Sequence, residues 1–273
     1  MVIKEIREKL QQPRYAKTTM LFRRSLAKEQ LIPYLLRFIY KHRDYRRLVF
    51  YGGTCAHVIY GLERLSEDID LHNPGVDLGM MGKDLEEYIG SELGISKGTV
   101  YKQKGEGGVM RWVVRLPIMY DLGLSPNKNE KLHLKLEISQ HSQIYGEQIS
   151  PVVTNGLAMV VRHFDETSLM AGKISACLKR VKMRGDKLSV KGRDWYDLWW
   201  WLKRGVEPNW KKLETEVGLR NWVELGERIK KKLDDLDLKE VELDLLPFWE
   251  DGEYVKVWVR NMRSDILRLM VIN

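Results

Sequence analysis

The sequence predicts an α+β fold, with a mixed β-sheet core, flanking helices and a helical C-terminal region. Up to about residue 154, short apolar or alternating segments typical of strands are separated by stretches with helical periodicity. Beyond that residue the pattern is helical. The chain has 273 residues, of which 44% are hydrophobic, so it can bury a sizeable core in one large domain or two ordinary ones.

The first half is expected to alternate helices and strands. Residues 17–45 predict a helix whose apolar positions include Leu21. Leu48–Tyr51 is a strand candidate that runs into two glycines, after which Thr54 suits the N-cap of a short helix closed by Gly61. The remaining elements expected here are a strand at 68–71, a helix at 78–93, and two antiparallel strands at 109–119 and 131–139.

The last of these strands has two unlike faces, because successive side chains on a strand alternate. One face is apolar and the other polar, with Leu132, Leu134, Leu136 and Ile138 against His133, Lys135, Glu137 and Ser139. The helices expected in the second half lie at 167–184, 193–204, 210–218, 222–234 and 255–270. We therefore expect a basic helical N-terminal segment at 1–46, a core at 47–155 and a helical C-terminal domain at 156–273.

Positive charge is concentrated at the N-terminus. Residues 1–47 hold 13 Lys and Arg against 4 Asp and Glu, a net charge of +9, whereas the whole chain carries +8. Such a segment attracts polyanions, and nucleic acid is the partner it would suit, although a merely solvated basic face has the same composition. The candidate nucleic-acid contacts are Arg23, Arg24, Lys41, Arg46 and Arg47.

Composition also excludes several classes of protein. No apolar run approaches the ~18 residues that a membrane-spanning helix needs, so no membrane partner is expected. Cys55 and Cys177 are the only cysteines, which excludes a disulfide framework and favours a reducing, cytoplasmic location. The cysteine and histidine spacing does not fit a zinc finger.

The stretch from Gly52 to Asp70 has the clearest chemical meaning. A strand, two glycines and a helix start expose backbone N–H groups to an anion, with the helix dipole behind them. Asp68 and Asp70 are two residues apart on a strand, so they project from one face. Carboxylates beside a phosphate-binding turn suit Mg²⁺, which favours oxygen ligands. Taken alone, the two glycines could form a simple turn, and the two aspartates could lie at a solvated strand end. Both motifs together at this spacing predict an active site.

These motifs resemble those of a known family. Gly52-Gly-Thr followed by Arg64-Leu-Ser-Glu-Asp-Ile-Asp70 is similar to the AbiEii/AbiGii-type nucleotidyltransferase toxins, of the DNA polymerase β-like nucleotidyltransferase superfamily. The run Lys173-Ile-Ser-Ala-Cys-Leu-Lys-Arg180 resembles that family's Lys motif. Arg193-Asp-Trp-Tyr-Asp197-Leu resembles its Arg-Asp-x-x-Asp-Leu motif. The resemblance spans roughly residues 48–204 and implies a nucleotidyltransferase core.

The resemblance also implies roles for individual residues. The expected catalytic residues are Asp68, Asp70, Lys173 and Asp194, with Asp197 supporting them. The expected metal ligands are Asp68, Asp70 and Glu137. The alternative for Glu137 is that it is an exposed strand residue and not a ligand. The expected nucleotide-binding residues are Gly52, Gly53, Thr54, Ser66, Lys173, Arg180 and Arg193.

Helical periodicity places the later motifs on faces of their helices. At 100° per residue, Lys173, Cys177, Arg180 and Arg184 fall on one side of the first helix. A solvated cationic face is the alternative to a triphosphate clamp there. In the next helix we expect Trp195, Leu198, Trp199 and Leu202 to pack, with Arg193, Asp194, Asp197 and Trp201 opposite. An i,i+4 ion pair would also explain Arg193 and Asp197.

Together these features predict a Mg²⁺-dependent nucleotidyltransferase that moves a nucleotide from an NTP to an acceptor hydroxyl. The resemblance implies the toxin of a toxin–antitoxin pair, with a cognate antitoxin, and the 3′ end of tRNA is the expected acceptor. Two alternatives stay open. One is a nucleotidyltransferase with a small-molecule or protein acceptor, and the other is a catalytically silent module that binds RNA or a partner.

Overall fold

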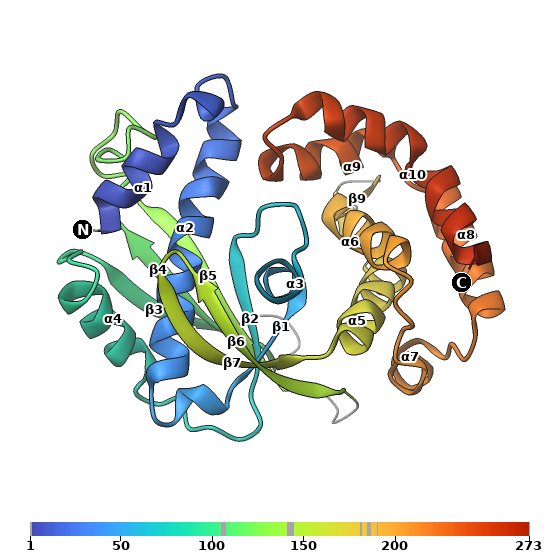
Figure 1. The fold of residues 1–273 in the computed structure, drawn as a ribbon, viewed down its shortest axis with the longest axis horizontal. Helices are drawn as coiled ribbons and strands as arrows, with labels where there is room; N and C mark the ends of the chain where they lie inside the picture. Colours follow the sequence, from blue (N-terminus) through green and yellow to red (C-terminus); the bar gives the residue numbers. More distant parts are fainter. Residues whose placement is uncertain are drawn as a thin grey trace. The chain divides into compact units, whose positions relative to one another are not determined.

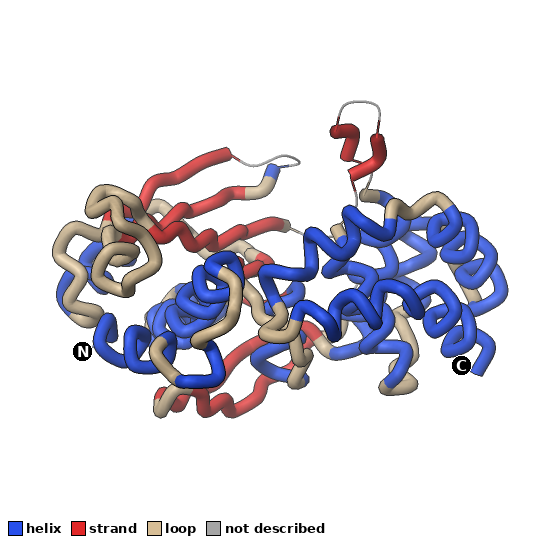
Figure 2. Tube along the Cα trace, turned by 90° about the horizontal axis from the view of Figure 1, so that it is seen from above, coloured by secondary structure: helices blue, strands red, loops and turns tan. Residues whose placement is uncertain are grey.

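The computed structural model describes residues 2–104, 108–140, 145–180, 182–184, 187–189 and 191–272. They form two compact units, coloured along the chain in Figure 1. The first unit holds the described residues up to 163 except 145 and 146, and the second holds those two and the residues from 164 on. The first unit combines a β-sheet with helices, whereas the described part of the second is mainly helical and includes one small strand pair (Figure 2).

The core of the first unit is a mixed sheet. Its strands are β1 (Val49–Tyr51), β2 (Asp68–His72), β3 (Thr99–Lys104), β4 (Met110–Leu116), β5 (Leu132–Ser139), β6 (Glu147–Thr154) and β7 (Leu157–Phe164). They form a seven-stranded sheet in the order β3-β4-β5-β2-β1-β7-β6. As predicted, β4 and β5 are antiparallel neighbours. β2 runs parallel to β5, and β1 runs antiparallel to β2 and parallel to β7. The predicted α+β class is confirmed.

The described residues of this unit form four α-helices: α1 (Val2–Leu10), α2 (Met20–Lys41), α3 (Gly52–Tyr60) and α4 (Met81–Ser91). The Thr19 hydroxyl caps the start of α2 by accepting the Phe22 N–H. The basic residues between positions 20 and 41 therefore lie on a regular helix. Leu21, expected among the apolar positions, is 59% exposed. The predicted apolar face of β5 is buried, with Leu132, Leu134, Leu136 and Ile138 at most 3% exposed.

Two local expectations for this unit are wrong. α3 begins at Gly52 with Tyr51 as its N-cap residue, so Thr54 lies inside the helix. The region from residue 156 is not helical at first, because β7 occupies Leu157–Phe164 and places His163 opposite Phe50 of β1. A boundary after residue 155 would therefore remove β7 from its sheet. The Asn155–Gly156 turn, with both φ values positive, is the hairpin signal that marks β6 and β7.

The second unit contains six helices in its described part: α5 (Glu166–Lys179), α6 (Gly192–Lys203), α7 (Trp210–Val217), α8 (Trp222–Asp234), α9 (Leu238–Leu245) and α10 (Gly252–Ile272). Side chains of Asp165, Asn209 and Asn221 accept backbone N–H groups at the starts of α5, α7 and α8. α9 has no counterpart among the predicted helices.

The first of these helices is shorter than predicted. α5 ends at Lys179, and Lys182–Arg184 forms the strand β8, paired with β9 (Lys187–Ser189). Arg184 therefore does not extend the cationic face of α5. In the described part of the chain, no helix is both long and apolar enough to cross a membrane.

Candidate active site

Three carboxylates lie on one face of the sheet. Asp68 and Asp70 are half-buried and alternate along β2, as predicted. The parallel register between β2 and β5 places Asp70 opposite Glu137 and Asp68 opposite Lys135. Residues directly opposite on neighbouring strands share a face, so the Glu137 side chain stands on the same side as the two aspartates.

The start of α3 contacts Asp70. Gly52 has a φ of +81°, and a Cβ atom added to it would lie 2.2 Å from Asp70 Oδ2. Only glycine allows both this backbone conformation and this approach. The first turn of a nine-residue helix, with the N–H groups of Gly53 and Thr54, therefore begins beside the carboxylate pair.

Gly52→Ala and Gly61→Ala form a matched pair that tests this contact. Both glycines have a φ near +80°, but a Cβ on Gly61 meets nothing within 4 Å. We expect each variant to lose roughly 1–2 kcal/mol of unfolding free energy from the left-handed conformation. Gly52→Ala should lose more than that, and should also lose the nucleotide transfer that the sequence predicts, because the added carbon displaces Asp70. Urea denaturation and a transfer assay measure the two effects, and equal activity in the two variants would contradict the role of this contact.

The loop between α3 and β2 is held from two sides. The Thr54 hydroxyl donates a hydrogen bond to the Asp68 carbonyl, and its oxygen lies 3.0 Å from Ser66 Oγ. From α2, Glu29 accepts the Ser66 N–H at 3.2 Å, and Lys28 pairs with Glu67 at 2.7 Å. Thr54 and Ser66 are at most 3% exposed. Their hydroxyls thus fix the approach of the chain to Asp68, and the predicted nucleotide contacts of Thr54 and Ser66 stay predictions.

A buried arginine completes this loop. Arg64 is 3% exposed, and its guanidinium donates to the Leu65 carbonyl at 2.9 Å and to Ser66 Oγ at 3.5 Å. Arg64 was not among the predicted site residues. The sequence signal that points to Arg64 is its position at the start of the Arg-x-Ser-x-Asp-x-Asp run. Its charged side chain can be buried because it has these hydrogen-bond partners.

Burial changes the protonation of groups around the pair. It raises the pKa of the Asp68 carboxyl; the charge of Lys135 opposes this, and Glu67 and Glu137 reinforce it. Burial also raises the pKa of the Cys55 thiol, with a further contribution from Asp70, so Cys55 is an unreactive core thiol. Burial lowers the pKa of His57, but its hydrogen bond to Glu29 and the charge of that residue outweigh burial and raise it.

The donor set of this site suits Mg²⁺. Two half-buried carboxylates on one face can hold the ion, with substrate phosphates and water completing its oxygen shell. Glu137 is engaged elsewhere, because Arg111 Nε lies 2.7 Å from its Oε1 atom. In the part of the chain that the structure describes, no three His, Cys, Asp or Glu side chains gather closely enough to hold a metal. Asp68 and Asp70 therefore fit the ion, and a ligand role for Glu137 would require Arg111 to release it.

Four other predicted residues come together within the second unit. Lys173 Nζ on α5 lies 3.0 Å from Asp194 Oδ1 and 2.7 Å from Asp197 Oδ2, both on α6. Arg180 pairs with the other oxygen of Asp194. The side chains of Lys173, Asp194 and Asp197 are 14%, 5% and 0% exposed. We call these four residues the Lys173 cluster.

This cluster corrects the expected faces of α6. Asp194, Asp197 and Trp201 were placed opposite the packing face, yet all three are buried. Burial raises the pKa of Asp194, but the charges of Lys173 and Arg180 outweigh it and hold the pKa well below the usual range. The two carboxylates can be buried because those cations neutralise them.

Arg193 is bound to a different helix. Its backbone N–H and its Nε atom lie 3.0 and 3.3 Å from Asp244 Oδ2 of α9, and its guanidinium stacks 4.3 Å from the centre of the Phe248 ring. Arg193 thus joins α6 to α9 and the turn that follows. Its predicted contact with nucleotide stays a prediction.

The basic residues of the N-terminal segment divide into two groups. Arg24 pairs with Glu130 at 2.8 Å, and Arg23 donates to the Leu10 carbonyl at 3.5 Å, so both are used within the fold. Lys41, Arg46 and Arg47 lie at the end of α2 and just after it, and all three are exposed. The second group is exposed to solvent, whereas Arg23 and Arg24 are half-buried.

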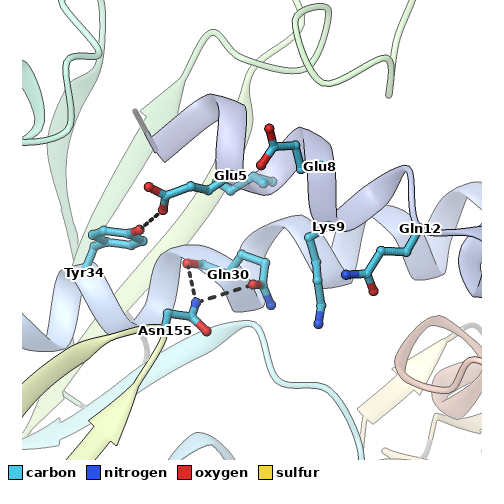
Figure 3. A pocket seen from close by; sticks show the side chains of 8 residues that line it. Glu5, Glu8, Lys9, Gln12, Gln30, Tyr34 and Asn155 are labelled. Carbon is cyan, nitrogen blue, oxygen red and sulfur yellow. Dashed lines mark hydrogen bonds between the residues drawn. The ribbon is translucent and has the colours of Figure 1, made fainter.

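Two hollows in the first unit involve other residues. Figure 3 shows one of about 360 Å³ between α1 and α2, where Tyr34 donates to Glu5 at 2.6 Å and the Asn155 amide donates to Gln30. The other, of about 500 Å³, is lined by residues that include Asp44, Arg47 and Asp84. Neither is lined by a predicted catalytic, metal-binding or nucleotide-binding residue.

Comparison with known proteins adds to this geometry. Residues 34–266 match the sequence model of a family described as "Nucleotidyl transferase AbiEii toxin, Type IV TA system". The fold is similar to that of MenT4, a nucleotidyltransferase toxin from Mycobacterium tuberculosis, with a TM-score of 0.58, 15% identity, and coverage of 97% of this chain and 89% of that one. It is also similar to JHP933 from Helicobacter pylori, with a TM-score of 0.50, 21% identity, and coverage of 91% and 94%. No curated protein matches the sequence.

Proposed function

Because the chain belongs to the AbiEii family of nucleotidyltransferase toxins, we propose that this nucleotidyltransferase moves a nucleotide from an NTP to an acceptor hydroxyl, with release of pyrophosphate. The observation that supports this reaction is the Asp68–Asp70 pair beside the first turn of α3. A phosphate group is attracted to the unpaired N–H groups of a helix N-terminus, and carboxylates placed next to it suit a divalent cation.

The proposal gives a part to each of the following site residues of the first unit. Asp68 and Asp70 would hold Mg²⁺, which would supply a lower pKa for the attacking hydroxyl and an offset to negative charge on the phosphates. Gly52 and Gly53 offer the phosphates an unobstructed backbone. Thr54, Ser66 and Arg64 keep the loop before β2 in place. The roles of Lys173, Arg180 and Asp194 toward the triphosphate stay predictions.

The proposed acceptor is RNA, with the 3′ end of tRNA as the specific candidate. The exposed basic residues Lys41, Arg46 and Arg47 support a polyanionic partner, because contacts of this kind release counterions from a phosphate backbone. Membership of a toxin–antitoxin family supports a cognate antitoxin as a further partner.

One transfer assay distinguishes the acceptor classes. Each NTP, radiolabelled at the α-phosphate, is incubated with the protein, Mg²⁺ and either RNA, a protein extract or a small-molecule fraction, and the products are separated on gels. We expect label in RNA of tRNA size, and none with Asp70→Asn or with EDTA. Label in protein or small molecules would replace the RNA acceptor, and no label in any fraction would contradict the transfer reaction.

A further inference from the structure

We propose that the polar face of β3, β4 and β5 binds the phosphates of a single-stranded RNA acceptor and leads its end to Asp68 and Asp70. We call this surface the β3–β5 face. The inference rests on the RNA acceptor proposed above, and adds the surface that holds it.

The strand register builds this face in transverse rows. One row runs from Asp70 through Glu137 to Arg111 and Gln103, and the next runs from Asp68 through Lys135 and the buried Val113 to Tyr101. A third row contains His133, Arg115 and Thr99. Neighbouring strands are ~4.8 Å apart, so the β4 positions stand about 10 Å from the aspartates. The face is thus continuous with the carboxylate pair and long enough for the nucleotides next to a reacting end.

Cations dominate the part of the face beyond the carboxylates. Glu137 neutralises Arg111, whereas neither Lys135 nor Arg115 forms an ion pair with another described residue. Lys131 and His133 are exposed, and Arg115 and Lys135 are half-buried. Burial lowers the pKa of His133, and the charges of Arg115, Lys28, Lys131 and Lys135 lower it further. These positive charges therefore act on one small area of the surface, and a phosphate backbone bound there would neutralise them.

An aromatic ring lies in the same area. The Arg115 guanidinium stacks 3.9 Å from the centre of the Tyr101 ring, and Arg115 Nε is buried without a hydrogen-bond partner in the described structure. Guanidinium planes and tyrosine rings are groups on which unpaired bases stack. A sheet face that combines them with unpaired lysines suits a single strand, since the bases of a duplex are already stacked on one another.

Salt-dependent binding tests this surface. Fluorescence anisotropy measures the affinity of a short, fluorescein-labelled single-stranded RNA at several salt concentrations, without NTP. The test variant is Arg115→Gln/Lys135→Gln. The matched control is Lys102→Gln/Lys104→Gln, because these exposed lysines of β3 alternate onto the opposite face. A third variant, Arg46→Gln/Arg47→Gln, tests the exposed end of the N-terminal segment.

We expect the test variant to bind RNA roughly 10-fold more weakly, with a salt slope flatter by about 0.7 for each lost phosphate contact, and the control to match the wild type. Thermal unfolding checks that each variant is folded; if the double variant is not, Lys135→Gln is measured alone. Wild-type affinity and slope in the test variant, or equal losses in test and control, would overturn the inference while leaving the transfer reaction in place. If the wild type binds no RNA but transfers nucleotide to another acceptor, both this surface and the RNA acceptor are wrong.

Discussion

Asp68→Asn and Asp70→Asn should each slow nucleotide transfer by ~10³-fold or more, because electrostatic stabilisation by a bound metal contributes several kcal/mol. Each substitution removes a charge while nearly preserving the shape of the side chain. Asp121→Asn, at an exposed position of the same unit, is the matched control and should keep full activity. The check is the rate of label transfer from NTP at saturating Mg²⁺, and wild-type rates in both site variants would contradict the assignment.

Although Asp68→Asn should lose activity, its thermal stability should not fall. Burial raises the pKa of Asp68 above its ordinary value, so the charged carboxylate is less favourable in the folded state than in the unfolded one. At neutral pH the neutral amide removes that cost. We expect a melting temperature equal to or above that of the wild type, which separates loss of chemistry from loss of structure.

Lys173→Ala should destabilise the second unit strongly. Removing the ammonium takes the ion-pair partner at 2.7 Å away from Asp197, which is 0% exposed, and leaves Asp194, which is 5% exposed, with Arg180 as its remaining ion-pair partner among the residues of the cluster. Breaking a buried ion pair by removing one partner costs about 3–5 kcal/mol. Lys179→Ala, an exposed lysine of the same helix, should cost far less. Urea unfolding of the two variants measures the difference, and equal free energies of unfolding would show that the Lys173 cluster contributes little.

The same cluster predicts an acid limit to stability. Because Lys173 and Arg180 hold the pKa of Asp194 below its unfolded value, its contribution is present at neutral pH. That contribution is lost as the pH falls below the ordinary aspartate range toward the depressed folded-state pKa. Asp194→Asn should therefore lower stability at neutral pH and show a weaker dependence on pH in acid. Thermal unfolding measured from neutral to acidic pH tests this, and parallel curves for variant and wild type would contradict it.

The sequence by itself determined the local part of the site. Side chains on a strand alternate, so the spacing of Asp68 and Asp70 was enough to place both on one face of β2. The two glycines required a special backbone at the start of a helix, and Gly52 has the left-handed φ that such a position needs. The alternation along residues 132–138 likewise predicted which face of β5 is buried. Each of these features depends on residues a few positions apart, for which geometry is nearly fixed.

Only the tertiary structure decided which distant side chains meet. Arg111 reaches Glu137 because β4 pairs with β5 in one particular register, and a shift of one residue would separate them. Lys173 meets Asp194 and Asp197 because α5 packs against α6, which turned an expected cationic surface into a buried ion network. Periodicity assigns a residue to a face of its own helix or strand, but not the partner that covers that face. That partner follows from the packing of segments far apart in the chain, where hydrophobic burial sets the arrangement and the charged groups must then find compensation.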